Sequence, residues 1–226
     1  MKIVSLIPYW SGYSFPENSL DMRDTLRLGG YSLINYTVKA ASQVDDIDEV
    51  IIYSSNEDVL DLIDKKNKCE FVKRDIDLDA NDVSIEDIIE RFMTVSDADI
   101  VVLMHPKSPF LRSETLSTCI AGVKNGEYDS AFLVSEVRKL AWFKGKPFNY
   151  RREKDTPSLS CLEPVFFESS SVYVFTRELF ERTRHRIGDN PLMFSVGHFE
   201  GFEVDKEDDY KMAELIINSG FESFGN

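Results

Sequence analysis

Short runs rich in apolar residues alternate along this chain with segments that repeat apolar residues at helical spacing. The apolar runs occupy positions 2–7, 49–53, 70–73, 99–104 and 129–134. Such alternation is typical of a three-layer α/β/α sandwich, in which helices cover both faces of a mainly parallel sheet. We therefore predict an α/β fold of this kind.

The intervening segments carry helix-start signals. Ser55 with Asp58, and Ser84 with Asp87, have the form of a capping box, in which each side chain satisfies a backbone N–H of the first turn. Helices are predicted over residues 33–41, 55–66, 84–92, 113–124, 177–184 and 206–218, and further strands over 172–175, 192–196 and 202–204.

Residues 138–167 interrupt the alternation. They contain three prolines, clustered aromatic residues and mixed charge without a helical period, which predicts an irregular excursion or a β-rich arm. With 42% hydrophobic residues among 226, the chain can bury one sizeable core, and no stretch is polar enough to be a linker. We predict a single domain over 1–226, with 138–167 as its arm.

The formal net charge of −14 repels phosphate backbones, so a nucleic-acid partner is not expected. The three cysteines show no CxxC spacing, which favours a reducing compartment. No apolar run is long enough to cross a bilayer, and the N-terminus enters a strand pattern without a cleavable signal. These features predict a cytoplasmic protein without a membrane partner.

Two carboxylates, Glu203 and Asp205, stand two residues apart at the end of the predicted 202–204 strand. Alternation along a strand turns positions i and i+2 to one side, so both can reach one Mg²⁺, a hard ion that prefers oxygen ligands. Acidic residues are also favoured at a helix N-terminus by the helix dipole, which is the alternative interpretation. In open α/β sheets the ligand lies at the carboxyl ends of the strands, here the loops after residues 7 and 104.

Four segments, in order, resemble the acylneuraminate cytidylyltransferases, the family of CMP-sialic acid synthetases. LGGYSLINYTVKAA (28–41) resembles the helix after the nucleotide loop, and HPKSPFLRSETL (105–116) resembles the family's LQPTSPLR segment. PVFFESSSVYVFTRELF followed by HRIG (185–188), and the closing FEVDKEDDYKMAELI, match the last third. The resemblance implies a Rossmann-like, GT-A-like nucleotidyltransferase fold with a small β-rich dimerisation arm.

The resemblance implies transfer of CMP from CTP to the anomeric hydroxyl of an acidic nonulosonate-type sugar, with release of pyrophosphate. Mg²⁺ is the implied cofactor, with Glu203 and Asp205 as catalytic metal ligands; Glu203 replaces the more usual aspartate. The implied partners are CTP, the anionic sugar and a second copy of the chain. The expected nucleotide-binding residues are Pro8, Tyr9, Ser11, Gly12, Tyr13, Ser14, Arg23, Arg27, Asn81, Ser84, His105, Lys107 and Ser108, and the expected substrate-binding residues are Arg112, Glu168, Ser169 and Ser170.

The nucleotide-binding loop departs from the family pattern. Where the family reads A-R-x-x-S-K-G, this chain reads PYWSGYS, so Tyr9 and Tyr13 replace an arginine and a lysine that pair with the triphosphate. Each charge-assisted hydrogen bond to phosphate contributes about 1.5–3 kcal/mol, so other groups must replace them or the substrate differs. Further replacements are Asp24 for a lysine, Leu159–Ser160 for Arg-Gln, Ser169–Ser170 for Asn-Gly, and His105 for a glutamine.

These departures leave two classes of function open. The first is an active nucleotidyltransferase that acts on an acidic sugar or another anionic acceptor such as a phosphonate. The second is a catalytically degenerate relative that serves as a binding or regulatory partner. The retained acidic pair favours the enzyme, and the missing basic residues favour the relative.

Overall fold

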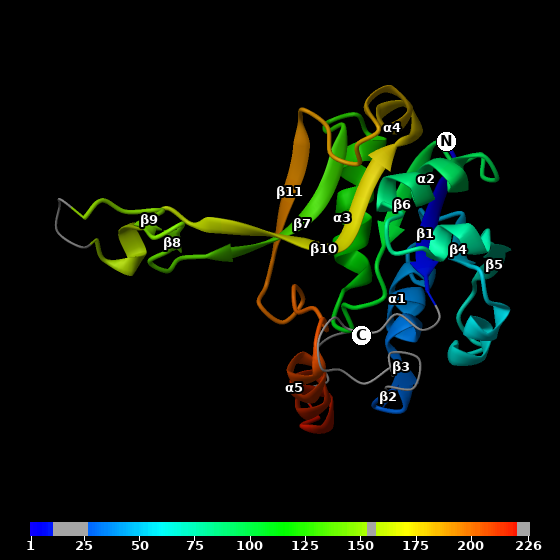
Figure 1. Cartoon of the computed structure of the whole chain (residues 1–226), viewed down its shortest axis with the longest axis horizontal. Coiled ribbons are helices and arrows are strands. Elements are labelled where there is room, and N and C mark those ends of the chain that lie inside the picture. Colours follow the sequence, from blue (N-terminus) through cyan, green and yellow to red (C-terminus); the bar gives the residue numbers. More distant parts are fainter. Residues whose placement is uncertain (11–26, 153–156, 221–226) are drawn as a thin grey trace.

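Seven strands form the central sheet, in the spatial order β11-β7-β10-β6-β1-β4-β5 (Figure 1). The computed structural model describes residues 1–10, 27–152 and 157–220. The strands are β1 (Ile3–Tyr9), β4 (Glu49–Ser54), β5 (Glu70–Lys73), β6 (Ile100–Met104), β7 (Ser130–Val137), β10 (Val165–Thr176) and β11 (Pro191–Val196). All neighbouring pairs are parallel except the two that involve β10, which confirms the predicted mainly parallel sheet.

Helices cover both faces of the sheet. Apolar residues of α1 (Leu33–Ser42) and α3 (Ser113–Lys124) pack with one alternate set of strand side chains. Those of α2 (Ile85–Met93) and α4 (Arg177–Thr183) pack with the other set. Because successive strand residues point to opposite faces, the two clusters are the two halves of a three-layer α/β/α core, as predicted.

A third, smaller cluster attaches the C-terminal helix α5 (Glu207–Asn218) to the body. Its buried members include Leu28 of the hairpin formed by β2 (Arg27–Leu28) and β3 (Tyr31–Ser32), together with Val204 and Ala213. This packing holds the segment just before α5 against the loop that follows β6.

Local helix signals were reliable where the capping side chain has no competing partner. Ser84 accepts from Asp87 N–H at 3.1 Å and Asp87 accepts from Ser84 N–H at 3.1 Å, so the capping box of α2 is confirmed. The predicted 55–66 helix is wrong. Ser55 donates instead to Asp79, and Asn56 caps a short 3₁₀ helix, η1 (Glu57–Leu62).

Two strand boundaries also differ from the prediction. β1 does not end before Pro8, which stays in register with Tyr53 of β4; beyond Leu6, β1 pairs with β4 alone. The predicted strand at 202–204 is absent, because that segment forms no ladder with any described strand. The other 3₁₀ helices are η2 (Ile76–Asp79) and η3 (Leu159–Cys161).

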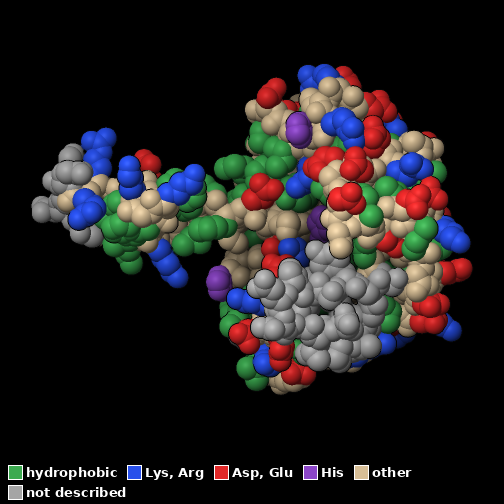
Figure 2. Space-filling view, viewed as in Figure 1, with side chains coloured by type: hydrophobic (Ala, Val, Ile, Leu, Met, Phe, Trp, Pro, Cys, Tyr) green, Lys and Arg blue, Asp and Glu red, His purple; other side chains and the backbone are tan. Residues whose placement is uncertain are grey.

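An arm projects from the sheet between β7 and β10, in the region predicted for it (Figure 1). The two strands continue their antiparallel pairing to Val137 and Val165, and a hairpin of β8 (Trp142–Phe143) and β9 (Lys146–Pro147) lies beyond. Hydrophobic side chains gather along this arm in Figure 2. Trp142, Phe143 and Phe148 in this region are exposed. Among the described residues, no helix has both the length and the apolarity needed to span a bilayer.

Gly188 is required by a close approach to Asp129. A Cβ at residue 188 would lie 2.3 Å from Asp129 Oδ2, and that oxygen is held because it accepts from Asn190 N–H at 2.8 Å. We predict that Gly188→Ala lowers the free energy of unfolding by about 1–3 kcal/mol in urea denaturation, the usual cost of overpacking. Gly197→Ala is the control, since a Cβ there meets nothing within 4 Å; equal losses in both variants would contradict the prediction.

Candidate active site

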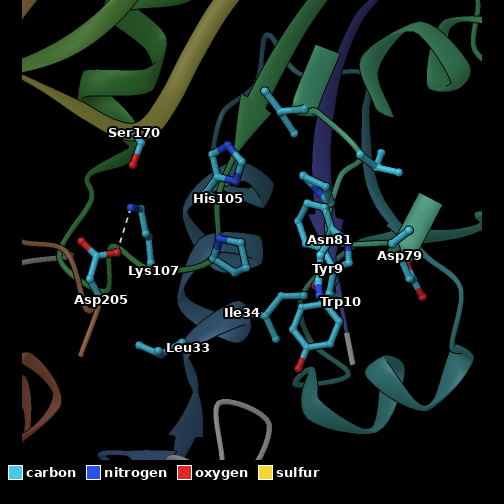
Figure 3. A pocket seen from close by; sticks show the side chains of 15 residues that line it. Tyr9, Trp10, Leu33, Ile34, Asp79, Asn81, His105, Lys107, Ser170 and Asp205 are labelled. Atoms are coloured by element: carbon cyan, nitrogen blue, oxygen red, sulfur yellow. Dashed lines mark hydrogen bonds and ion pairs between the residues drawn. The ribbon is translucent and has the colours of Figure 1, made fainter. Parts of the chain in front are cut away.

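A cavity of about 410 Å³ opens at the carboxyl ends of β1 and β6 (Figure 3). This is the edge where parallel sheets of this kind bind ligands. Seven of the predicted site residues line it, from five separate parts of the chain: Pro8, Tyr9, Asn81, His105, Lys107, Ser170 and Asp205. The cavity is also lined by Trp10, Leu33, Ile34, Asp79, Ala80, Val83, Ile85 and Pro106.

The remaining predicted residues lie around the cavity or outside the described part of the chain. Ser84 caps α2, Ser108 is buried, and Arg27 lies on β2, where its carbonyl accepts from the Tyr210 hydroxyl at 3.3 Å. The backbone N–H of Arg112 donates to the buried Glu200 carboxylate at 3.2 Å. Ser11, Gly12, Tyr13, Ser14 and Arg23 fall outside the described residues.

Asp205 lines the cavity and Glu203 contacts Lys107 beside it, although no strand carries either acidic residue. The N–H of Val204 donates to the carbonyl of Lys107 at 2.8 Å, and the Val204 side chain is fully buried beneath them. This anchor places Glu203 and Asp205 on either side of one fixed residue, next to the loop after β6. The side-by-side geometry predicted for a strand end is therefore produced by a single tertiary backbone contact.

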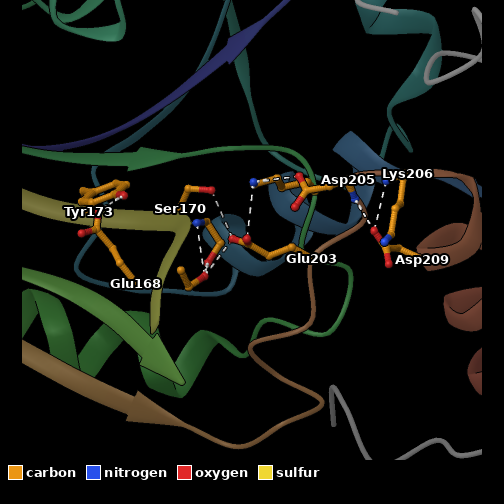
Figure 4. Close-up of polar contacts among 10 residues, drawn as sticks. Glu168, Ser170, Tyr173, Glu203, Asp205, Lys206 and Asp209 are labelled. Atoms are coloured by element: carbon orange, nitrogen blue, oxygen red, sulfur yellow. Dashed lines mark hydrogen bonds and ion pairs between the residues drawn. The ribbon is translucent and has the colours of Figure 1, made fainter. Parts of the chain in front are cut away.

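Both carboxylates converge on the ammonium group of Lys107. Its Nζ lies 3.0 Å from Asp205 Oδ1 and 3.4 Å from Glu203 Oε2. Figure 4 labels the two carboxylates. The side chains of Lys107 and Glu203 are each 17% exposed, whereas Asp205 is 56% exposed toward solvent. Of the two carboxylates, Glu203 is therefore largely buried and Asp205 is open to solvent.

An irregularity in β10 holds Glu203 in place. The register between β10 and β7 shifts between Ser169 and Tyr173. There Ser169 and Ser170 donate to Glu203 Oε1 at 2.9 and 3.4 Å, and Ser171 O accepts from His105 N–H at 2.9 Å. Bulges commonly re-aim side chains beside functional sites. Here the bulge fixes the orientation of one carboxylate and joins β10 to the loop after β6.

The donor set suits a divalent cation that also binds a substrate. Across the described residues, no group of three or more His, Cys, Asp or Glu side chains forms a self-sufficient metal site. Mg²⁺, however, is usually held by one or two carboxylates together with substrate phosphates and water. Glu203 and Asp205 fit that requirement, because one oxygen of each already points at a common position.

His105 is a neutral group at the cavity wall. Desolvation lowers the pKa of its imidazole from 6.5 to about 4, and the nearby positive charges of Lys107 and Arg186 act in the same direction. A neutral imidazole offers one hydrogen-bond donor and one acceptor. His105 can therefore orient a ligand hydroxyl without adding charge.

The carboxylate of Glu168 forms a hydrogen bond within the protein. Its Oε1 accepts from the hydroxyl of Tyr173 at 2.5 Å. Burial, together with this hydrogen bond, raises the pKa of Tyr173 to about 12, so the hydroxyl keeps its proton. The guanidinium of Arg186 lies 4.3 Å from the centre of the Tyr173 ring and pairs with Glu86. Arg186 links this cluster to His105, because its positive charge contributes to the lowered pKa of that imidazole.

Sequence reasoning missed Arg74, which follows β5 and supports Trp10. Its side chain is fully buried, with its guanidinium 4.5 Å from the centre of the Trp10 ring. Its Nη2 donates to the carbonyl of Tyr9 at 3.1 Å and pairs with Asp79. Burial lowers the pKa of Arg74, against the effect of Asp79. The available signal was an arginine directly after the predicted 70–73 strand, at the ligand-binding edge.

The low pKa of His105 predicts a pH-dependent contribution to stability. The unfolded chain binds this proton below about pH 6.5 and the folded protein only below about pH 4, so stability present above pH 6.5 is lost as the pH falls toward 4. We predict that His105→Gln removes up to about 3 kcal/mol of this acid-side loss, measured by denaturation at each pH. The exposed His185→Gln is the control, and parallel curves for wild type and His105→Gln would contradict the prediction.

Comparisons with known proteins show which family the chain belongs to. The family described as Cytidylyltransferase matches residues 24–182. No curated protein sequence matches the chain. Among solved structures, a CMP:2-keto-3-deoxy-manno-octonic acid synthetase complexed with CTP superposes with a TM-score of 0.71 at 18% identity, covering 97% of this chain and 100% of the other.

A second solved structure supports the same fold. It is 4-diphosphocytidyl-2C-methyl-D-erythritol synthase from Anaerococcus prevotii DSM 20548, with a TM-score of 0.67 at 13% identity and 96% of each chain covered. At such identities these likenesses show the nucleotidyltransferase fold, whereas the family match spans most of the chain. This protein therefore belongs to the cytidylyltransferase family.

Proposed function

We propose that this protein transfers CMP from CTP to an anionic acceptor, most specifically an acidic nonulosonate-type sugar, and releases pyrophosphate. The observation that carries the proposal is the convergence of Glu203 and Asp205 on one point at the mouth of the cavity, 3.4 and 3.0 Å from Lys107 Nζ. Family membership supports the cytidylyl donor. The fold shared with a CMP:2-keto-3-deoxy-manno-octonic acid synthetase supports an acidic sugar acceptor.

In the proposed reaction, the acceptor hydroxyl oxygen forms a bond to the α-phosphorus of CTP. The bond from that phosphorus to the bridging oxygen breaks, pyrophosphate leaves with the electron pair, and the hydroxyl proton passes to solvent. Glu203 and Asp205 would hold Mg²⁺, which would supply Lewis-acid stabilisation of phosphate charge. The residues of this chain bind and align the two reactants, since phosphoryl transfer depends mainly on positioning and electrostatics.

Each wall of the cavity suits one part of these reactants. Trp10, backed by Arg74, offers a flat aromatic surface for the base, beside Asn81. Lys107 offers a positive charge to the triphosphate. His105 and Ser170, at the junction of β6 and β10, lie where the acceptor would approach. This arrangement leaves Asp205, the more exposed carboxylate, next to both reactants.

Removal of Asp205 tests the proposed role of the acidic pair. Asp205→Ala should lower the rate of pyrophosphate release from CTP, Mg²⁺ and a keto-acid sugar by at least about a hundredfold, because a preorganised electrostatic group is lost. Asp208→Ala is the matched control, since Asp208 is 85% exposed on α5 and should retain nearly full activity. Wild-type protein that shows no turnover with a broad acceptor panel, and no thermal shift with any nucleotide, would instead favour a catalytically degenerate partner protein.

The arm supports the proposal of a homodimer. Trp142, Phe143 and Phe148 expose apolar surface on a projecting hairpin, where burial against a second copy would remove it from water. We predict that Phe143→Ser with Phe148→Ser makes the protein monomeric in light scattering. Ile76→Ser, at an exposed apolar residue that follows the edge strand β5 and lies outside the arm, is the control. A monomeric wild type would contradict this part of the proposal.

A further inference from the structure

Lys107 occupies the position that the proposed cation would take. Its Nζ bridges Asp205 Oδ1 at 3.0 Å and Glu203 Oε2 at 3.4 Å. Mg²⁺ requires oxygen ligands at about 2.0–2.1 Å, so an ion shared by the same two oxygens would fall where the ammonium now lies. The lysine and the ion therefore exclude each other.

We propose that Lys107 is an internal substitute for the divalent cation: it holds the carboxylate pair together until a cation replaces it, and it then binds the triphosphate. This inference rests on the proposed function and goes beyond it, because it assigns one side chain two successive positions. Under this proposal, Lys107 can bind the nucleotide only after a metal ion has bound to the carboxylates.

The carboxylates differ in how much they depend on Lys107. Glu203 is held through its other oxygen by Ser169 at 2.9 Å and Ser170 at 3.4 Å, so it keeps its orientation when the lysine leaves. Within the described part of the chain, the side chain of Asp205 has Lys107 as its charged partner. Two nearby like charges are unfavourable without compensation, and Lys107 supplies that compensation in the absence of a metal.

The backbone of the loop is fixed while the side chain is free to turn. His105 N–H donates to Ser171 O at 2.9 Å, and Val204 N–H donates to Lys107 O at 2.8 Å. The four-carbon stem of Lys107 can swing from the carboxylates into the cavity that it already lines (Figure 3). No rearrangement of the main chain is needed for the exchange.

The positive charge of Lys107 is important for binding a triphosphate in the cavity. Of the described residues that line it, Lys107 alone carries a permanent positive charge, because His105 is neutral and Arg74 lies behind Trp10. A triphosphate bound there would contact Lys107 once a cation has released it from Glu203 and Asp205. Metal and nucleotide should therefore favour each other's binding through this side chain.

Removal of the lysine should move two affinities in opposite directions. Lys107→Met should raise the affinity of the nucleotide-free protein for Mn²⁺, followed by electron paramagnetic resonance, by about tenfold, because the competing ammonium is gone. The same change should lower the affinity for CTP at saturating Mn²⁺ by about tenfold, measured calorimetrically, which corresponds to about 1.4 kcal/mol. A merely structural role for Lys107 would weaken both.

Two further variants distinguish competition between Lys107 and the cation from a general effect of charge and from misfolding. Lys206→Met removes a positive charge adjacent in sequence to Asp205 and should change both affinities by less than about threefold. Lys107→Arg keeps the charge and should stay near wild type in Mn²⁺ affinity. Unchanged or weaker Mn²⁺ binding by Lys107→Met, in a wild type that binds Mn²⁺ and CTP, overturns this inference alone; a wild type that binds neither overturns the proposed function as well.

Discussion

The hydrogen bond from Val204 N–H to the carbonyl of Lys107, 2.8 Å long, is the contact on which the proposed site depends. It joins two segments that are distant in sequence and fixes both carboxylates beside the loop after β6. Burial of Val204 against Leu28, Leu33 and Phe110 supports it from below. Because α5 packs into the same cluster, the C-terminal helix stabilises the position of the acidic pair.

Local and periodic patterns predicted the layers of the fold. The alternation of apolar runs with helical segments indicated the three-layer sandwich, and Ser84 with Asp87 located the start of α2. The direction of β10 was harder to predict, because it follows from the arm: β7 and β10 form the stem of a long hairpin and must therefore be antiparallel. The prediction of a 55–66 helix failed because Ser55 donates to Asp79, across the chain, and Asn56 caps a short 3₁₀ helix in its place.

The site was only partly accessible from sequence, since its key contacts join distant segments. The spacing of Glu203 and Asp205 indicated a shared ligand, but their position came from the Val204 contact and not from a strand. The partnership of both carboxylates with Lys107 has no signature in the sequence. The same is true of Arg74, which follows β5 and contacts Trp10, after β1, across the intervening strand β4. Sequence reasoning thus named candidate chemical groups, and the tertiary structure shows which of them lie together.

The position of Lys107 beside Glu203 and Asp205 bears on the residues missing from the nucleotide-binding loop. A chain that lacks two loop cations needs positive charge elsewhere, and Lys107 is placed to provide it.

Anomalous diffraction from Mn²⁺ in crystals grown with CTP tests this account most directly. The account predicts one peak about 2.1 Å from an oxygen of each of Glu203 and Asp205, with Lys107 turned onto the triphosphate. Nucleotide bound with Lys107 still bridging the two carboxylates, or a metal peak away from them, would contradict it.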